Sequence, residues 1–148
     1  MQKNKNKKIR LVVDANAWIS SLLKPRFHER LKIVFDAGYH LLVSEELFSD
    51  LASAMRKPYL VKHIKQVEYE SLVSLLRAEA ELVDVHSIVV ACRDPKDNFL
   101  LALAKDGNAD YLITGDNDLW SMKQFEKTII VSLNEFETIE KQTVPQTW

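Results

Sequence analysis

Cysteine is almost absent from the sequence, since Cys92 is the only one, and this excludes an internal disulfide and a cysteine-based zinc site. Only 3 glycines and 4 prolines occur in 148 residues, too few for a collagenous or low-complexity chain. The longest hydrophobic run, residues 99–104, is far shorter than the ~18 residues that a membrane span requires. The composition is that of one globular domain, and we expect a soluble, cytoplasmic protein with no membrane contact.

An excess of positive charge is also missing from most of the chain. The first ten residues carry five of the 20 basic residues and none of the 21 acidic ones, which leaves 15 basic against 21 acidic residues in the remainder. A globally basic nucleic-acid binder is therefore excluded. A polyanionic partner must be held by local basic patches, by the basic N-terminal segment or through metal ions. We expect a basic, flexible arm at residues 1–9, a single domain at residues 10–142 and a polar tail at residues 143–148.

Strand-like and helix-like segments alternate along the domain. Short β-branched or apolar runs predict strands at residues 10–13, 40–43, 82–83, 111–113 and 129–131, with a weaker candidate at 88–91. Apolar spacing and capping residues predict helices at residues 17–23, 28–37, 45–57, 67–80 and 95–106, with a last helix after Ser132. This alternation predicts an α/β fold with a mostly parallel sheet covered on both faces.

Acidic residues follow several of these predicted strands. Ligands of parallel sheets bind outside the carboxyl ends of the strands, so we expect these acids to converge at one edge. They are Asp14, beside Asn16; Glu45, Glu46 and Asp50; Asp94 and Asp97; and Asp116, beside Asn117 and Asp118. Clustered carboxylates repel one another unless a cation lies among them, and oxygen-only ligand sets suit Mg²⁺ and Mn²⁺. Such a site, without a nucleotide-binding loop, is typical of phosphodiester hydrolysis.

Four motifs in sequence order resemble a known family. They are Leu11-Val-Val-Asp14-Ala-Asn16, Ser44-Glu-Glu-Leu-Phe-Ser-Asp50-Leu, Arg93-Asp94-Pro-Lys-Asp97-Asn-Phe-Leu-Leu-Ala-Leu-Ala104 and Ala109-Asp-Tyr-Leu-Ile-Thr114-Gly-Asp116. Together they resemble a PIN domain, in particular the VapC-like ribonucleases that are toxins of prokaryotic toxin–antitoxin pairs. The resemblance implies a three-layer α/β/α sandwich and a Mg²⁺- or Mn²⁺-dependent endoribonuclease. The implied metal ligands and catalytic residues are Asp14, Asp97 and Asp116, with one acid from the helix after the second strand.

That fourth acid departs from the family pattern. The family usually has glutamate at the position that aligns with Asp50, and Glu46 lies four residues earlier on the same helical face. We predict Asp50 as the ligand because Leu47 and Leu51 keep the family's apolar spacing around it. Glu46 remains the alternative.

Five residues are secondary candidates, and most have a plainer structural explanation. Asp94 suits an N-cap before Pro95, Thr114 can simply end a strand, and a Gly-Asp-Asn-Asp turn favours acids for local reasons. The secondary candidates are Asn16, Glu46, Asp94, Thr114 and Asp118.

Two classes of function remain open. The first is an endoribonuclease toxin, with RNA as substrate, a cognate antitoxin protein as partner and a homodimer as one possible assembly. The second is a catalytically weak or inactive PIN-fold protein that uses its acidic groove to bind a cation or a protein partner.

Overall fold

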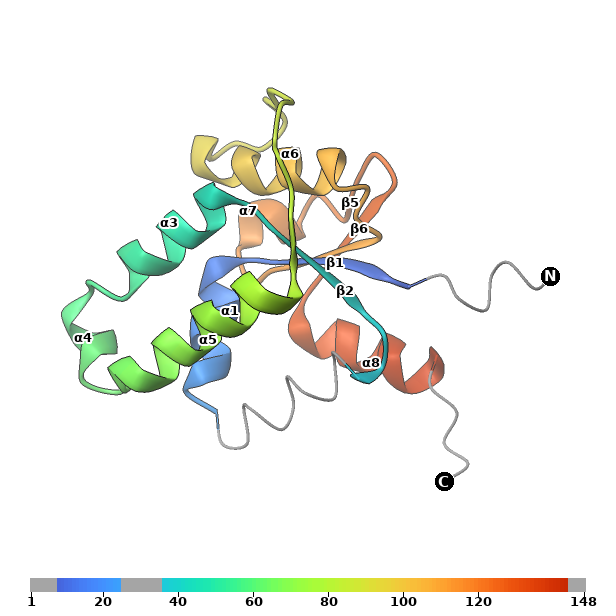
Figure 1. The fold of residues 1–148 in the computed structure, drawn as a ribbon. Helices are drawn as coiled ribbons and strands as arrows, with labels where there is room; N and C mark the ends of the chain where they lie inside the picture. The colour runs from blue at the N-terminus through green and yellow to red at the C-terminus, as the bar shows by residue number, and fades with distance from the viewer. Residues whose placement is uncertain (1–7, 25–35, 144–148) are drawn as a thin grey trace.

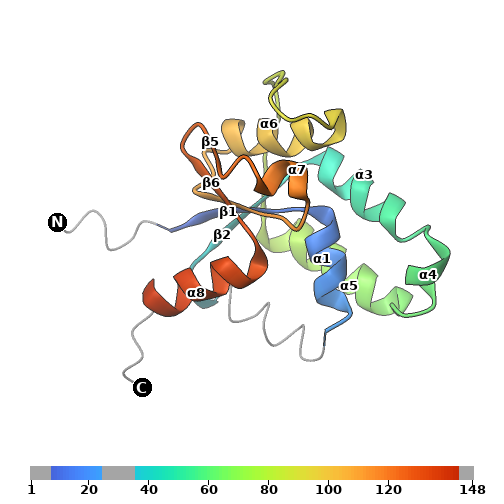
Figure 2. The same ribbon diagram turned by 180° about the vertical axis from the view of Figure 1, so that it is seen from behind.

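The computed structural model describes residues 8–24 and 36–143, which form a six-stranded sheet with helices on both sides (Figures 1 and 2). Its strands are β1 (Arg10–Val13), β2 (His40–Val43), β3 (Glu81–Leu82), β4 (Tyr111–Ile113), β5 (Gln124–Phe125) and β6 (Thr128–Val131). Its helical elements are α1 (Ala15–Leu22), α3 (Glu45–Ala54), α4 (Pro58–Val61), α5 (Gln66–Glu79), the 3₁₀ turn η2 (Pro95–Asp97), α6 (Asn98–Asp106), α7 (Asn117–Trp120) and α8 (Leu133–Thr143). None of the helices in the described ranges has the length and apolar character needed to cross a bilayer.

The order of the strands locates the place where a ligand is expected. The order is β3-β2-β1-β4-β6-β5, and every pairing is parallel except that of β5 with β6. Val12 of β1 pairs with Leu42 of β2 on one side and with Leu112 of β4 on the other. The strands that follow β1 in sequence are therefore added to the sheet on both sides of it. The boundary between β1 and β4 is the topological switch point of the sheet.

Helices cover both faces of the sheet, as the sequence pattern predicts. Figures 1 and 2 show α6 on one side and α1, α5 and α8 on the other. The central strands are accordingly apolar at successive positions, and Leu11, Val12, Leu42 and Leu112 are almost fully buried. The predicted three-layer α/β/α fold with a mostly parallel sheet is confirmed.

Most of the predicted elements are present with small shifts at their ends. The expected strands at residues 10–13, 40–43 and 111–113 are β1, β2 and β4 without any shift. The helix expected at residues 17–23 starts two residues earlier, because Asp14 caps it. The arm of residues 1–9 and the tail of residues 143–148 fall mostly outside the described residues, as does the helix expected at 28–37.

One prediction of local structure is wrong. Residues 88–91 do not form a strand; the Asp106 side chain accepts from the backbone N–H groups of His86 and Ser87, and the Asn98 side chain accepts from those of Ala91 and Cys92. The helix expected at residues 95–106 is present with the predicted Asp94 cap, and only its first turn, η2, is 3₁₀ rather than α-helical.

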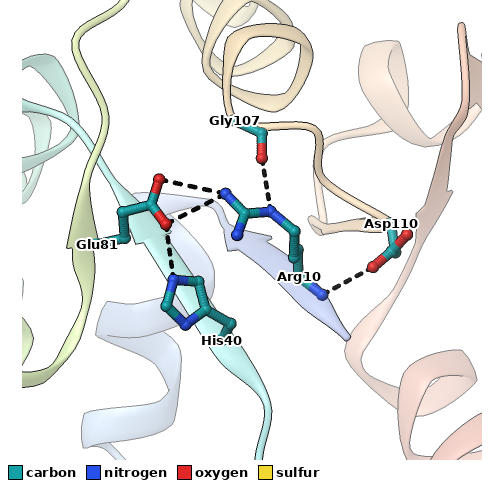
Figure 3. A network of polar contacts seen from close by, with 5 residues as sticks. All are labelled: Arg10, His40, Glu81, Gly107 and Asp110. Carbon is teal, nitrogen blue, oxygen red and sulfur yellow. Dashed lines mark hydrogen bonds and ion pairs between the residues drawn. The ribbon is translucent and has the colours of Figure 1, made fainter. Parts of the chain in front are cut away.

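A polar network ties the strands together at the edge where the parallel strands begin (Figure 3). The Arg10 guanidinium donates to both carboxylate oxygens of Glu81 at 3.2 Å and to the carbonyl oxygen of Gly107 at 2.8 Å. His40 Nε2 lies 2.7 Å from Glu81 Oε1, and the backbone N–H of Arg10 donates to Asp110 Oδ2. The Glu81 carboxylate therefore links the first residues of β1, β2 and β3.

We expect Glu81→Gln to lower the free energy of unfolding at pH 7 by up to about 1 kcal/mol, because the pair is partly exposed to solvent. The hydrogen bond from His40 and the contacts with Arg10 lower the pKa of Glu81. Because this pKa is lower in the folded than in the unfolded chain, the ionised Glu81 carboxylate stabilises the fold above about pH 4.5. This stabilisation is lost as the pH falls through the folded-state pKa. Thermal melts at pH 7 and pH 3 check this: the wild type and the variant should differ only at pH 7.

Candidate metal centre

The two strands that flank the switch point each lead into an aspartate. Asp14 is the first residue after β1, and its carboxylate caps α1 by accepting from the backbone N–H of Asn16 at 3.2 Å. Asp116 follows β4 and caps α7 by accepting from the backbone N–H of Asp118 at 2.8 Å. Because β1 and β4 are adjacent and parallel, both carboxylates lie at the same edge of the sheet.

A second pair of aspartates comes from the turn before α6. Asp94 caps η2 by accepting from the backbone N–H of Lys96, and Asp97 is the last residue of that turn. Asp94 precedes this single turn and Asp97 ends it, and one carboxylate oxygen of each lies within 4.8 Å of the other. Asp97 is buried, with 7% of its surface exposed, whereas Asp94 is only half-buried.

Three of these carboxylates form a tight cluster. One oxygen from each of Asp94, Asp97 and Asp116 lies within 4.8 Å of the other two. Asp14 is not part of this closest set, but Thr114 connects it to the cluster. The Thr114 hydroxyl donates to Asp14 Oδ2 at 2.8 Å and accepts from the backbone N–H of Asp116 at 3.1 Å. Thr114 is 1% exposed, so this bridge is shielded from water.

The cluster is electrostatically unfavourable for its own carboxylates. Burial raises the pKa of Asp97 from 3.8 to about 7, helped by a hydrogen bond and charge repulsion from Asp116 and by the charges of Asp94 and Asp14. The cluster therefore disfavours the ionised form of Asp97. A bound cation would offset this effect by stabilising the carboxylate.

Asp14 and Asp50 experience the same crowding. Burial raises the pKa of Asp14, although its hydrogen bonds from Thr114 and Asn16 oppose the change. Asp50 lies in the middle of α3 and is exposed, yet partial desolvation and the charges of Glu46 and Asp14 raise its pKa. Asp50 therefore lies within electrostatic range of Asp14, although it is not among the three clustered carboxylates.

The donor set fits a hard divalent cation. The clustered ligand atoms are all carboxylate oxygens, the type that Mg²⁺ and Mn²⁺ prefer. Burial first, and then the neighbouring carboxylates, raise the pKa of Asp97 and so disfavour its ionised form, and a bound cation would offset both effects. Both observations fit an ion held by Asp94, Asp97 and Asp116, with Asp14 beside them.

Sequence reasoning missed two residues that support Asp97. The Cys92 thiol donates to Asp97 Oδ2 at 3.8 Å, and Cys92 is buried. The Asn98 side chain accepts from the backbone N–H groups of Ala91 and Cys92 at 3.1 Å and 2.8 Å. These contacts hold the segment before η2 against the start of α6. No residue spacing indicates them, because they depend on the path of an irregular loop.

The remaining secondary candidates lie around the cluster. Asn16 is exposed, and its backbone supports Asp14. Glu46 is exposed on α3, one turn before Asp50. Asp118 forms an ion pair with Arg93, whose Nη2 lies 2.7 Å from Asp118 Oδ1. Asp94, expected only as a secondary residue, lies in the closest set, while Asp14, expected as a primary residue, lies beside it.

Comparison with known proteins decides the family. Residues 10–118 match the family model of the PIN domain, which covers all of the acids described above. The chain belongs to the PIN-domain family. It is also 24% identical over 135 residues to the uncharacterized protein MJ1680 of Methanocaldococcus jannaschii, covering 89% of this chain and 86% of that protein.

A solved structure shares this fold. A chain in the crystal structure of VapBC2 from Rickettsia felis, bound to a DNA fragment from its promoter, superposes with a TM-score of 0.52 at 12% identity. The match covers 82% of this chain and 97% of that one. The PIN domain of RRP44 from T. brucei is similar at a TM-score of 0.49 and 11% identity, covering 93% and 84%. PIN domains are in general nucleases and typically use divalent metals.

Proposed function

We propose that this PIN domain is a Mg²⁺- or Mn²⁺-dependent endoribonuclease and the toxin of a toxin–antitoxin pair. The observation that carries the proposal is the set of three carboxylates within 4.8 Å of one another at the switch point of the sheet, in a chain of the PIN family. The choice of RNA as substrate rests on the likeness of the four motifs to those of VapC-like ribonucleases.

The chain's own residues have distinct parts in this proposal. Asp97 and Asp116 would hold the ion together with Asp14 and with Asp50 from α3, and Asp94, which belongs to the closest set of carboxylates, would share in the binding. When bound, the ion supplies charge that polarises a phosphodiester and lowers the pKa of a water molecule. Thr114 fixes the orientation of the Asp14 carboxylate, and burial of Asp97 keeps bulk water from weakening the interactions there.

A cleavage assay tests the proposal. Purified protein is incubated with structured RNAs in Mg²⁺, Mn²⁺ or EDTA, and the ends of the products are analysed. We expect cleavage only with a divalent ion, and products with 5′-phosphate and 3′-hydroxyl ends. Binding of Mn²⁺ without cleavage of any RNA would instead favour a cation-binding or partner-binding PIN protein.

The partner proposal draws on the VapBC2 complex. The similar chain from Rickettsia felis was solved in the VapBC2 complex bound to promoter DNA. Because this chain shares the fold, we propose a cognate antitoxin protein as its partner. An RNA-cleaving toxin and its antitoxin would act in the cytoplasm. Size-exclusion chromatography with light scattering checks whether the chain alone is the proposed homodimer.

The fourth acid can be assigned by two matched variants on α3. Asp50→Asn is expected to reduce cleavage at least tenfold, while Glu46→Gln is expected to change it less than twofold, because the pKa of Asp50 responds to the Asp14 charge. Both residues are exposed, so neither variant should affect folding. Initial rates in Mn²⁺ check this prediction. Loss of activity in Glu46→Gln with Asp50→Asn unharmed would reverse the assignment.

A further inference from the structure

An arginine spans the two segments that supply the carboxylate cluster. Arg93 lies between Cys92, whose thiol contacts Asp97, and Asp94 of the cluster. Its guanidinium reaches across to Asp118, with Nη2 2.7 Å from Asp118 Oδ1. The backbone N–H of Asp118 in turn donates to Asp116 Oδ1. Arg93 is thereby fixed at the rim of the candidate metal centre.

The ion pair between Arg93 and Asp118 contributes little to the stability of the fold. The Arg93 side chain is 87% exposed, and exposed ion pairs contribute about 0–1 kcal/mol. The pair does restrain the direction of a long side chain. A guanidinium carries five N–H donors, and the described residues supply a single carboxylate acceptor for them. The other donors face the solvent beside the cluster.

A polyanion approaching this centre meets mostly negative charge. Among the described residues, the cations that act on the acids of the site are Arg93, which pairs with Asp118, and Lys96, which lowers the pKa of Asp50. Arginine presents a planar fork of donors that matches the oxygens of a phosphate group, whereas lysine acts as a point charge. Arg93 therefore has the geometry for a phosphate contact that Lys96 lacks.

We propose that Arg93 binds a backbone phosphate of the RNA strand beside the metal centre, and that Asp118 holds the guanidinium in position for it. This inference rests on the proposed ribonuclease function. It assigns Arg93 to substrate binding, with no part in holding the ion.

The test measures binding of a fluorescein-labelled, mixed-sequence single-stranded RNA by anisotropy in Ca²⁺, over a series of salt concentrations. Arg93→Ala should weaken binding about tenfold and reduce the slope of log K against log salt by about 0.7. Arg93→Lys should recover part of the affinity, because it keeps the charge but loses the fork. The matched control is Lys105→Ala, which removes the cation of a different surface ion pair, with Glu126, and should bind RNA like the wild type.

The variant Asp118→Asn tests whether RNA binding depends on Arg93 itself or only on the ion pair that Arg93 forms with Asp118. It loosens the guanidinium but also removes a negative charge beside the phosphate, so it should weaken RNA binding much less than Arg93→Ala does. All variants should keep the rise in melting temperature that Mn²⁺ gives the wild type. The proposal is overturned if Arg93→Ala binds RNA like Lys105→Ala, or if Asp118→Asn loses as much affinity as Arg93→Ala. A wild-type protein that neither binds RNA nor responds to Mn²⁺ would contradict the ribonuclease function itself.

Discussion

Replacing Asp116 by asparagine is expected to lower metal-dependent RNA cleavage by roughly a hundredfold or more while leaving the fold intact. The variant removes one of the three closest carboxylates, and charge stabilisation by a catalytic ion corresponds to several kcal/mol of the barrier. The fold is retained because asparagine caps a helix as well as aspartate does, so the contact with the backbone N–H of Asp118 survives. Rates with Mn²⁺ and melting temperatures in EDTA check both parts.

The matched control for this variant is Asp84→Asn. Asp84 is exposed and pairs with His86, so it lies outside the cluster. It should cleave RNA at the rate of the wild type. Loss of cleavage in Asp116→Asn, purified in the same way, then excludes a contaminating nuclease as the source of the activity. Equal cleavage by Asp116→Asn and Asp84→Asn would mean that the cluster has no catalytic part.

Replacing Asp97 by asparagine is expected to raise the stability of the metal-free protein and to abolish its stabilisation by Mn²⁺. The difference between 3.8 and about 7 in the pKa of Asp97 corresponds to roughly 4 kcal/mol. Because neighbouring carboxylates share this titration, we expect about half of that value, or a melting temperature higher by about 5 °C in EDTA at pH 7.5.

The dependence of this effect on pH follows from the direction of the pKa change. The folded-state pKa of Asp97 is raised, so folding of the wild type takes up a proton. The stability gained from this protonation is complete below about pH 4. It is lost as the pH rises toward 7. In EDTA, the wild type should therefore be less stable at pH 7.5 than at pH 5, and Asp97→Asn should show a smaller loss. If Asp97→Asn were less stable at pH 7.5 and still stabilised by Mn²⁺, Asp97 would be a structural residue of η2.

The sequence predicted the parts of the site that depend on the sheet. β1 and β4 are short apolar runs that end near an aspartate, and the rule for parallel sheets is enough to bring Asp14 and Asp116 to one edge. The parts that depend on irregular backbone were not predictable. The 3₁₀ geometry of η2 places Asp94 beside Asp97, whereas the sequence indicated a plain α-helical N-terminus.

The same limit explains the missed strand β5. Its hairpin turns through a positive φ angle at Glu126, and Lys123 just before the strand also has a positive φ, but no glycine or asparagine marks either position. The contact of Cys92 with Asp97 was missed because it follows from the loop that Asn98 fixes, and hydrophobic periodicity carries no information about such a loop. Regular elements were thus readable from the sequence, while the contacts that shape the acid cluster required the three-dimensional structure.

The central claim is that these carboxylates hold a divalent ion, and anomalous diffraction from a Mn²⁺-soaked crystal tests it most directly. We predict an anomalous peak in contact with carboxylate oxygens of Asp97 and Asp116, and its absence in crystals of Asp116→Asn soaked in the same way. No peak at this edge of the sheet, or a peak at other residues alone, would contradict the claim.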